Sequence, residues 1–122
     1  MDKLLELGLN EEDLKDIIDI DEDISSLEDN EISEKIKILQ NINCDDKEIR
    51  NIIISNPEYL TNITEEILNV ISKLKELNIE NLNIVFDSNP WLLNISVDEI
   101  NDALKDKDLT KLSQSEIIEL II

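Results

Sequence analysis

The sequence predicts an all-α protein, a short right-handed stack (solenoid) of about three helix-hairpin repeats with a C-terminal capping helix. Apolar residues recur at helical spacing, as in Ile32, Ile36 and Leu39, which form one stripe along a helix. One glycine and two prolines in 122 residues leave too little turn material for a β-protein of this length. Hydrophobic residues make up 41% of the chain, which is enough to build a core, and most are Ile or Leu.

The chain resembles itself at a regular interval. At an offset of 35 residues nine apolar residues fall on apolar residues, including Ile32 on Ile67 and Ile36 on Ile71. At an offset of 33, Asn56-Pro57 falls on Asn89-Pro90. Such periods are typical of stacked supersecondary units, each of which cannot bury its apolar face alone. We expect one domain spanning residues 1–122, with units at 1–27, 28–60 and 61–93 and a C-terminal cap at 94–122.

Each unit pairs a longer helix with a shorter one, and the chain then turns. Proline at Asn56-Pro57 and Asn89-Pro90 cannot continue a helix, and Glu22 stands in its place in the first unit. The apolar residues after each proline are expected to form a short turn that fills the gap between units. The predicted helices span residues 2–8, 11–20, 30–41, 46–55, 64–77, 80–88, 96–106 and 113–122.

The starts of four helices carry capping signals. Ser96 with Glu99 and Ser113 with Glu116 fit the capping box, in which hydroxyl and carboxylate each satisfy an orphaned amide. Asn10 precedes three acids, which would lie at the positive end of a helix dipole, and Thr64 is likewise expected to cap the helix at 64–77.

The predicted core is branched and aliphatic. Seven of its residues are expected to be buried: Ile36, Ile52, Ile53, Ile67, Ile71, Leu74 and Leu93. The last helix has more apolar residues than one face can hide, so it either caps the open end of the stack or forms a dimer contact.

The units resemble a known repeat. A leucine-rich helix end, a second helix, the turn Asn89-Pro90-Trp91-Leu92-Leu93 and a helix led by Ser96 are similar to the mitochondrial transcription termination factor (mTERF) repeat. The resemblance covers residues 4–104, with the proline missing from the first unit. It implies a helical repeat protein that binds nucleic acid along a basic concave face. That basic face is absent here, because the net charge is −19, Arg50 is the only arginine and the lysines are scattered.

Acidic residues crowd into the first 34 positions, where fourteen acids outnumber two lysines and give −12 of the −19. This surface is either a solubility device or a docking site for a protein with a basic surface, including by presenting DNA-like charge. The candidate interface residues are Asp19, Asp21, Glu22, Asp23, Glu28, Asp29 and Glu31. An alternative interface comprises Trp91, Ile117, Ile118 and Ile121, the last three on the C-terminal helix.

The sequence favours no catalytic, cofactor or metal site. An EF-hand loop starting at Asp19 fails at its diagnostic positions, which hold Ile24 and Asn30 instead of glycine and glutamate. There is no histidine, no glycine-rich phosphate loop and no nucleophile elbow, so we expect no enzyme. Cys44 is expected to be a small apolar residue at a helix boundary, its pKa raised by Asp45 and Asp46.

These observations predict a non-enzymatic acidic protein-interaction module that binds or inhibits a basic protein, such as a nucleic-acid-binding one. The alternative is an mTERF-like nucleic-acid-binding repeat protein. We expect no cofactor, a cytoplasmic location without membrane contact, and a monomer or a weak dimer through the C-terminal helix. No stretch approaches the roughly 18 apolar residues of a membrane span, and the first residues lack a secretory pattern.

Overall fold

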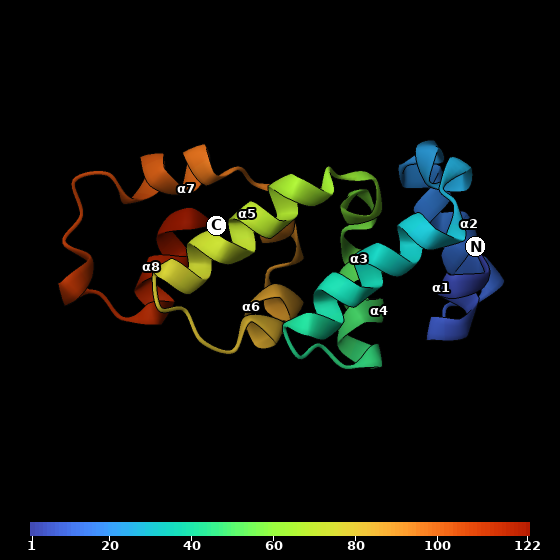
Figure 1. The fold of residues 1–122 in the computed structure, drawn as a ribbon, viewed down its shortest axis with the longest axis horizontal. Helices are drawn as coiled ribbons and strands as arrows, with labels where there is room; N and C mark the ends of the chain where they lie inside the picture. Colours follow the sequence, from blue (N-terminus) through green and yellow to red (C-terminus); the bar gives the residue numbers. More distant parts are fainter.

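The structure is a computed structural model that describes residues 1–122, and it contains helices and no strand (Figure 1). The all-α prediction is therefore confirmed. The α-helices are α1 (Asp2–Leu7), α2 (Glu11–Ile20), α3 (Asp29–Asn41), α4 (Asp46–Ser55), α5 (Thr64–Glu76), α6 (Leu82–Ser88), α7 (Val97–Leu104) and α8 (Gln114–Ile121). Four short 3-10 helices join them: η1 (Glu22–Ser26), η2 (Pro57–Thr61), η3 (Pro90–Asn94) and η4 (Leu109–Lys111).

The elements recur in a fixed order along the chain. Two α-helices followed by a 3-10 helix occur three times, and α7, η4 and α8 follow. In Figure 1 they succeed one another along the long axis, from α1 and α2 on the right to α7 and α8 on the left. The C-terminal cap expected at 94–122 is thus itself a pair of helices. The right-handed solenoid and the unit boundaries stay predictions.

The first helix of each repeated pair ends in the same way. Gly8, Asn43 and Asn78, spaced by 35 residues, all have left-handed backbone conformations, with φ of 115°, 71° and 61°. The next N–H in each case reaches back 3.0 Å to a leucine carbonyl, which is the Schellman arrangement that satisfies the free carbonyls of a helix end. The three bonds run from Leu9 to Leu4, from Cys44 to Leu39 and from Ile79 to Leu74. All six of these side chains are buried, so the repeat places the same apolar contact at each corner.

The helix starts agree with the sequence at three of the four predicted caps. The boxes Ser96 with Glu99, Ser113 with Glu116 and Asn10 with Asp13 are formed. Thr64 is the exception, because Ile63 is the N-cap of α5 and Thr64 is its first helical residue. The side-chain carbonyl of Asn62 instead accepts the Ile63 N–H at 2.9 Å, so the polar group that orders this entry lies two residues earlier than predicted.

Six of the seven predicted core residues are buried, but Ile36 is only partly covered. On α3 the inward positions are instead Ile32, Lys35, Ile38 and Leu39. Lys35 is 6% exposed, and its Nζ donates to the carbonyls of Leu60 at 3.0 Å and Asn62 at 2.7 Å. Its aliphatic stem therefore fills the inner face while its ammonium reaches polar partners, which turns the buried face of the helix away from Ile36.

The turn after Asn56-Pro57 is anchored to the preceding helix. The Tyr59 hydroxyl on η2 is fully buried and donates to the backbone carbonyl of Lys35 at 2.7 Å. Burial raises the pKa of Tyr59. Burial lowers the pKa of Lys35, and the nearby Glu34 and Glu31 oppose that shift. Bonds in both directions between Lys35 and η2 fix this turn, which forms the middle of the pocket described next.

Candidate functional site

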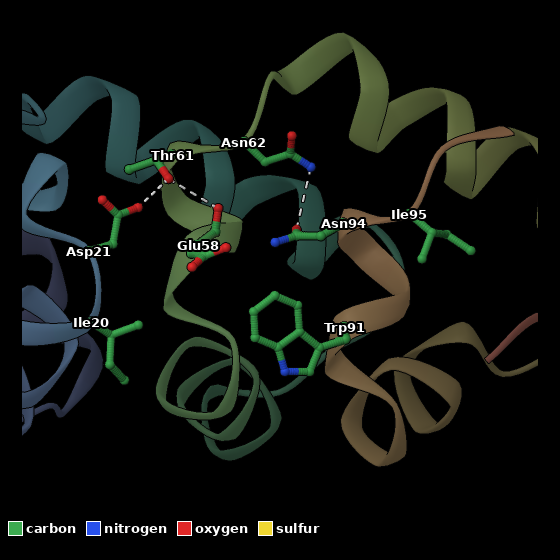
Figure 2. A pocket seen from close by; sticks show the side chains of 8 residues that line it. All are labelled: Ile20, Asp21, Glu58, Thr61, Asn62, Trp91, Asn94 and Ile95. Carbon is green, nitrogen blue, oxygen red and sulfur yellow. Dashed lines mark hydrogen bonds between the residues drawn. The ribbon is translucent and has the colours of Figure 1, made fainter. Parts of the chain in front are cut away.

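A surface pocket of about 660 Å³ opens where the turns of three successive helix pairs meet (Figure 2). We call it the inter-unit pocket, and it is lined by Ile20, Asp21, Glu58, Thr61, Asn62, Trp91, Asn94 and Ile95. The end of α2 supplies one wall, η2 the middle and η3 the other wall. The pocket exists because η1 packs against η2 and η2 packs against η3.

Repetition of the sequence places equivalent positions in this pocket. Glu58 and Trp91 each follow the proline of an Asn-Pro turn and are 33 residues apart, as are Thr61 and Asn94. The offset of 33 therefore contained the signal for Glu58, Thr61 and Asn94, which sequence reasoning did not select. The offset of 33 could not show that the turns η2 and η3 line the same pocket.

The wall between η2 and η3 is held by side-chain amides. Asn56 is fully buried; its Nδ2 donates to the Pro90 carbonyl at 2.9 Å, and its Oδ1 accepts from Asn94 Nδ2 at 3.1 Å. Asn62 Nδ2 lies 3.3 Å from the Leu93 carbonyl and 3.4 Å from Asn94 Oδ1 (Figure 2). Asn56, the asparagine before Pro57, thus ties its turn to the next one, which orders the pocket wall.

Two carboxylates and one indole define the chemistry of the pocket. Asp21 accepts from the Thr61 hydroxyl at 2.6 Å and from the Asp23 N–H at 3.1 Å, so its position is fixed. Glu58 is exposed, and no group of the chain donates to its carboxylate. The Trp91 ring points into the hollow and is 52% exposed (Figure 2). Negative charge beside an open aromatic face suits a cation and disfavours a phosphate.

The predicted acidic interface divides into exposed and structurally engaged residues. Asp19, Glu22 and Asp23 are exposed at the end of α2 and on η1, next to the pocket residue Asp21. Asp29 pairs with the α-ammonium of Met1 at 3.0 Å, which lowers the pKa of that carboxyl.

Glu28 and Glu31 serve the start of α3. The backbone N–H of Glu28 donates to the Glu31 carboxylate at 3.1 Å. Both side chains are nevertheless exposed, so their charge contributes to the acidic surface around η1. The candidate residues thus include capping groups as well as free carboxylates, a distinction that counting charges along the sequence does not make.

The cations of the chain lie outside the inter-unit pocket. The single arginine, Arg50, donates to the Leu7 carbonyl at 3.0 Å, and Lys35 is buried. Three lysines, at positions 105, 107 and 111, are exposed on the connection between α7 and α8, interspersed with Asp106 and Asp108. None of the eight residues that line the inter-unit pocket is basic, so the negative charges of Asp21 and Glu58 are not compensated within it.

The fold keeps only part of the alternative interface together: Trp91 and Ile121 line a second pocket of about 300 Å³, whereas Ile117 and Ile118 do not. Trp91 lies in the same pocket as Asp21, so the structure brings together one residue from each of the two candidate interfaces. The other three residues, Ile117, Ile118 and Ile121, are buried against the rest of the chain at 5–8% exposure. The apolar side chains that α8 and the residue after it expose are Leu120 and Ile122.

Three further features bear on chemistry. Cys44 is buried, and desolvation together with Glu48, Asp87 and Asp45 raises the pKa of its thiol to about 12, in the direction predicted. No group of three or more Cys, Asp or Glu side chains has a geometry that could hold a metal ion. No helix has the length and apolar character that crossing a membrane requires.

Comparison with known proteins identifies the family. The family model for mTERF matches residues 1–122. No curated protein and no solved structure matched the chain. The resemblance seen at residues 4–104 therefore extends over every helix of the chain, including the first pair, in which Glu22 stands in place of the proline. The chain belongs to the mTERF family.

Proposed function

We propose that this mTERF-family chain is a non-enzymatic protein-interaction module, cytoplasmic, that binds a partner protein through a basic surface on that partner. The observation that carries the proposal is the inter-unit pocket, which holds Asp21 and Glu58 and no cation. A surface of this kind attracts positive groups and repels phosphate backbones. In a repeat protein, such a hollow between units is where an extended partner segment would lie.

The acidic surface beside the pocket supports the same partner chemistry. Asp19, Glu22 and Asp23 are exposed there, and the first 34 residues carry −12 of the net charge. Charge complementarity of this sort speeds association and sets orientation more than it adds affinity. A nucleic-acid-binding protein would bind this acidic surface with the same basic residues that bind DNA. Binding would therefore inhibit the nucleic-acid binding of such a partner.

The second candidate function is nucleic-acid binding, which the family match favours. It would use exposed lysines outside the inter-unit pocket, which is acidic, and three of these lysines lie on the α7–α8 connection. A mobility-shift assay with duplex DNA and single-stranded RNA at several salt concentrations separates the two. Binding by phosphate neutralisation would weaken steeply with salt. We expect no shift of either nucleic acid at about 0.1 M salt.

The acidic surface is tested by removing charge without removing structure. The variant Asp19→Asn/Glu22→Gln/Asp23→Asn keeps Asp21, which the fold uses. Its matched control removes three exposed acids elsewhere, as Glu65→Gln/Asp98→Asn/Asp102→Asn. We expect the first variant to bind a fluorescein-labelled hepta-arginine amide more slowly than the control does, with the difference shrinking as salt rises.

Equal association rates for the two variants would mean that the acidic crowding near the N-terminus serves only solubility. A DNA or RNA shift at about 0.1 M salt, with no binding of the basic peptide, would replace the proposal by the second candidate.

A further inference from the structure

We infer that the inter-unit pocket binds an arginine side chain of the basic partner, with the guanidinium held between the Trp91 ring and the carboxylates of Glu58 and Asp21. This inference rests on the proposed function and adds to it the place and the side chain that are recognised. It commits to one occupant because the pocket offers negative charge and an aromatic face together.

The pocket has room for such a ligand. Its volume of about 660 Å³ exceeds what one side chain needs, so the flanking backbone of a peptide also fits. Its entrance is bordered by Ile20 and Trp91, which are 58% and 52% exposed on opposite walls (Figure 2). These apolar surfaces match the methylene stem of an arginine, which is the part of the side chain that prefers to leave water.

Trp91 supplies the attraction for a cation. The face of an indole ring attracts a positive charge within about 6 Å, and tryptophan does so best among the aromatic residues. The ring is open to solvent, and it lies at the mouth of a hollow bordered by polar groups (Figure 2). A tryptophan that served only to pack the two turns together would be covered, as Leu60 and Leu93 of the same turns are.

Glu58 supplies the charge that is free to pair. Its carboxylate accepts no hydrogen bond from the chain, whereas Asp21 already accepts from Thr61 and from the Asp23 N–H. The side-chain amide of Asn94 is engaged on both its oxygen and its nitrogen. Glu58 is therefore the group that a ligand would engage first, with Asp21 as a fixed second charge.

Arginine fits this arrangement better than lysine. A planar guanidinium stacks on an aromatic ring and presents parallel N–H groups to a carboxylate at the same time, whereas an ammonium does one or the other. A nucleic-acid base could also stack on Trp91, but its phosphates would then lie beside Asp21 and Glu58 and be repelled.

The test uses Trp91 as its own reporter, because it is the only tryptophan in the chain. Hepta-arginine amide is titrated into the protein at about 0.15 M salt, and Trp91 fluorescence is followed together with the anisotropy of a labelled peptide. The variant is Glu58→Gln and its control is Glu65→Gln, an exposed acid on α5 outside the pocket. Both variants lose the same charge, so a general electrostatic effect cancels.

We expect saturable binding that changes Trp91 fluorescence, weakened about fivefold by Glu58→Gln and unchanged by Glu65→Gln. Trp91→Leu, followed by anisotropy, should weaken binding as well, and hepta-lysine should bind less tightly than hepta-arginine. If the peptide binds while Trp91 fluorescence stays constant and the two variants behave alike, the cation is held elsewhere; the inference falls and the proposed function stands. If the peptide does not bind at all, both fall.

Discussion

The substitution Asn56→Ala tests how the stack is held together. Asn56 is 0% exposed, and its amide makes two hydrogen bonds to the next turn, to the Pro90 carbonyl at 2.9 Å and from Asn94 at 3.1 Å. Each bond contributes about 1 kcal/mol, and its loss leaves a polar partner without a replacement. The free energy of unfolding should therefore fall by about 2–4 kcal/mol, which is large for a chain of this size.

The chain offers a matched control at Asn89, which also precedes a proline and lies 33 residues further on. Its Nδ2 donates to the Val85 carbonyl within the same local turn at 3.0 Å, and the side chain is partly exposed. It makes no bond to another unit, so Asn89→Ala should cost no more than about 1 kcal/mol.

Urea denaturation followed by far-ultraviolet circular dichroism measures both variants. The midpoint should fall much further for Asn56→Ala than for Asn89→Ala, with the slope of the transition unchanged. Equal losses at the two positions, or a loss below about 0.5 kcal/mol at Asn56, would refute the idea that this residue joins successive units.

Four further outcomes follow from the structure. Ile71 is 5% exposed, so Ile71→Ala should lower the free energy of unfolding in urea by about 2–5 kcal/mol. Ile36 is partly exposed, so Ile36→Ala should lower it clearly less. The reverse order would mean that α3 buries a different face. Gly8→Ala should lower the free energy of unfolding by more than about 1 kcal/mol, and the melting temperature with it, because φ is 115° and the added Cβ would lie 3.0 Å from Arg50 Nη1. Burial raises the pKa of Cys44 to about 12 in the native state, whereas the unfolded thiol ionises around its ordinary pKa of 9.0, so stability should fall between these pH values. It should fall less in Cys44→Ala, as pH-dependent urea midpoints would show. Raising salt from low concentration to about 0.5 M should raise the melting temperature by screening the crowded carboxylates, and an unchanged melting temperature would argue against that repulsion.

Most of the fold was predictable because its signals are local and repeated. The sequence pattern predicted every α-helix to within about two residues at each end, and the offset of 35 carries the left-handed corners at Gly8, Asn43 and Asn78. Ile36 was assigned wrongly because an apolar stripe counts lysine as polar, whereas Lys35 buries its stem and bonds two carbonyls. Such a lysine is recognisable only once its partners are placed.

The candidate site was less predictable, because it depends on which turns face each other. The charge count found Asp21, and the second Asn-Pro turn drew attention to Trp91, but they were assigned to different interfaces. Glu58 was not selected as a site residue, because it is one of thirty acidic residues and its neighbours in the sequence do not distinguish it. Only the packing of η2 between η1 and η3 puts the three side chains around one hollow.

The central claim is that this mTERF-family chain recognises a basic protein segment and not a nucleic acid. The most direct measurement is a parallel titration of the unmodified protein with labelled hepta-arginine amide and with labelled duplex DNA at about 0.15 M salt, both followed by the anisotropy of the label and by Trp91 fluorescence. The peptide should give a saturable change that salt weakens, and the DNA should give none. Saturable binding of DNA, with no response to the peptide, would contradict the claim.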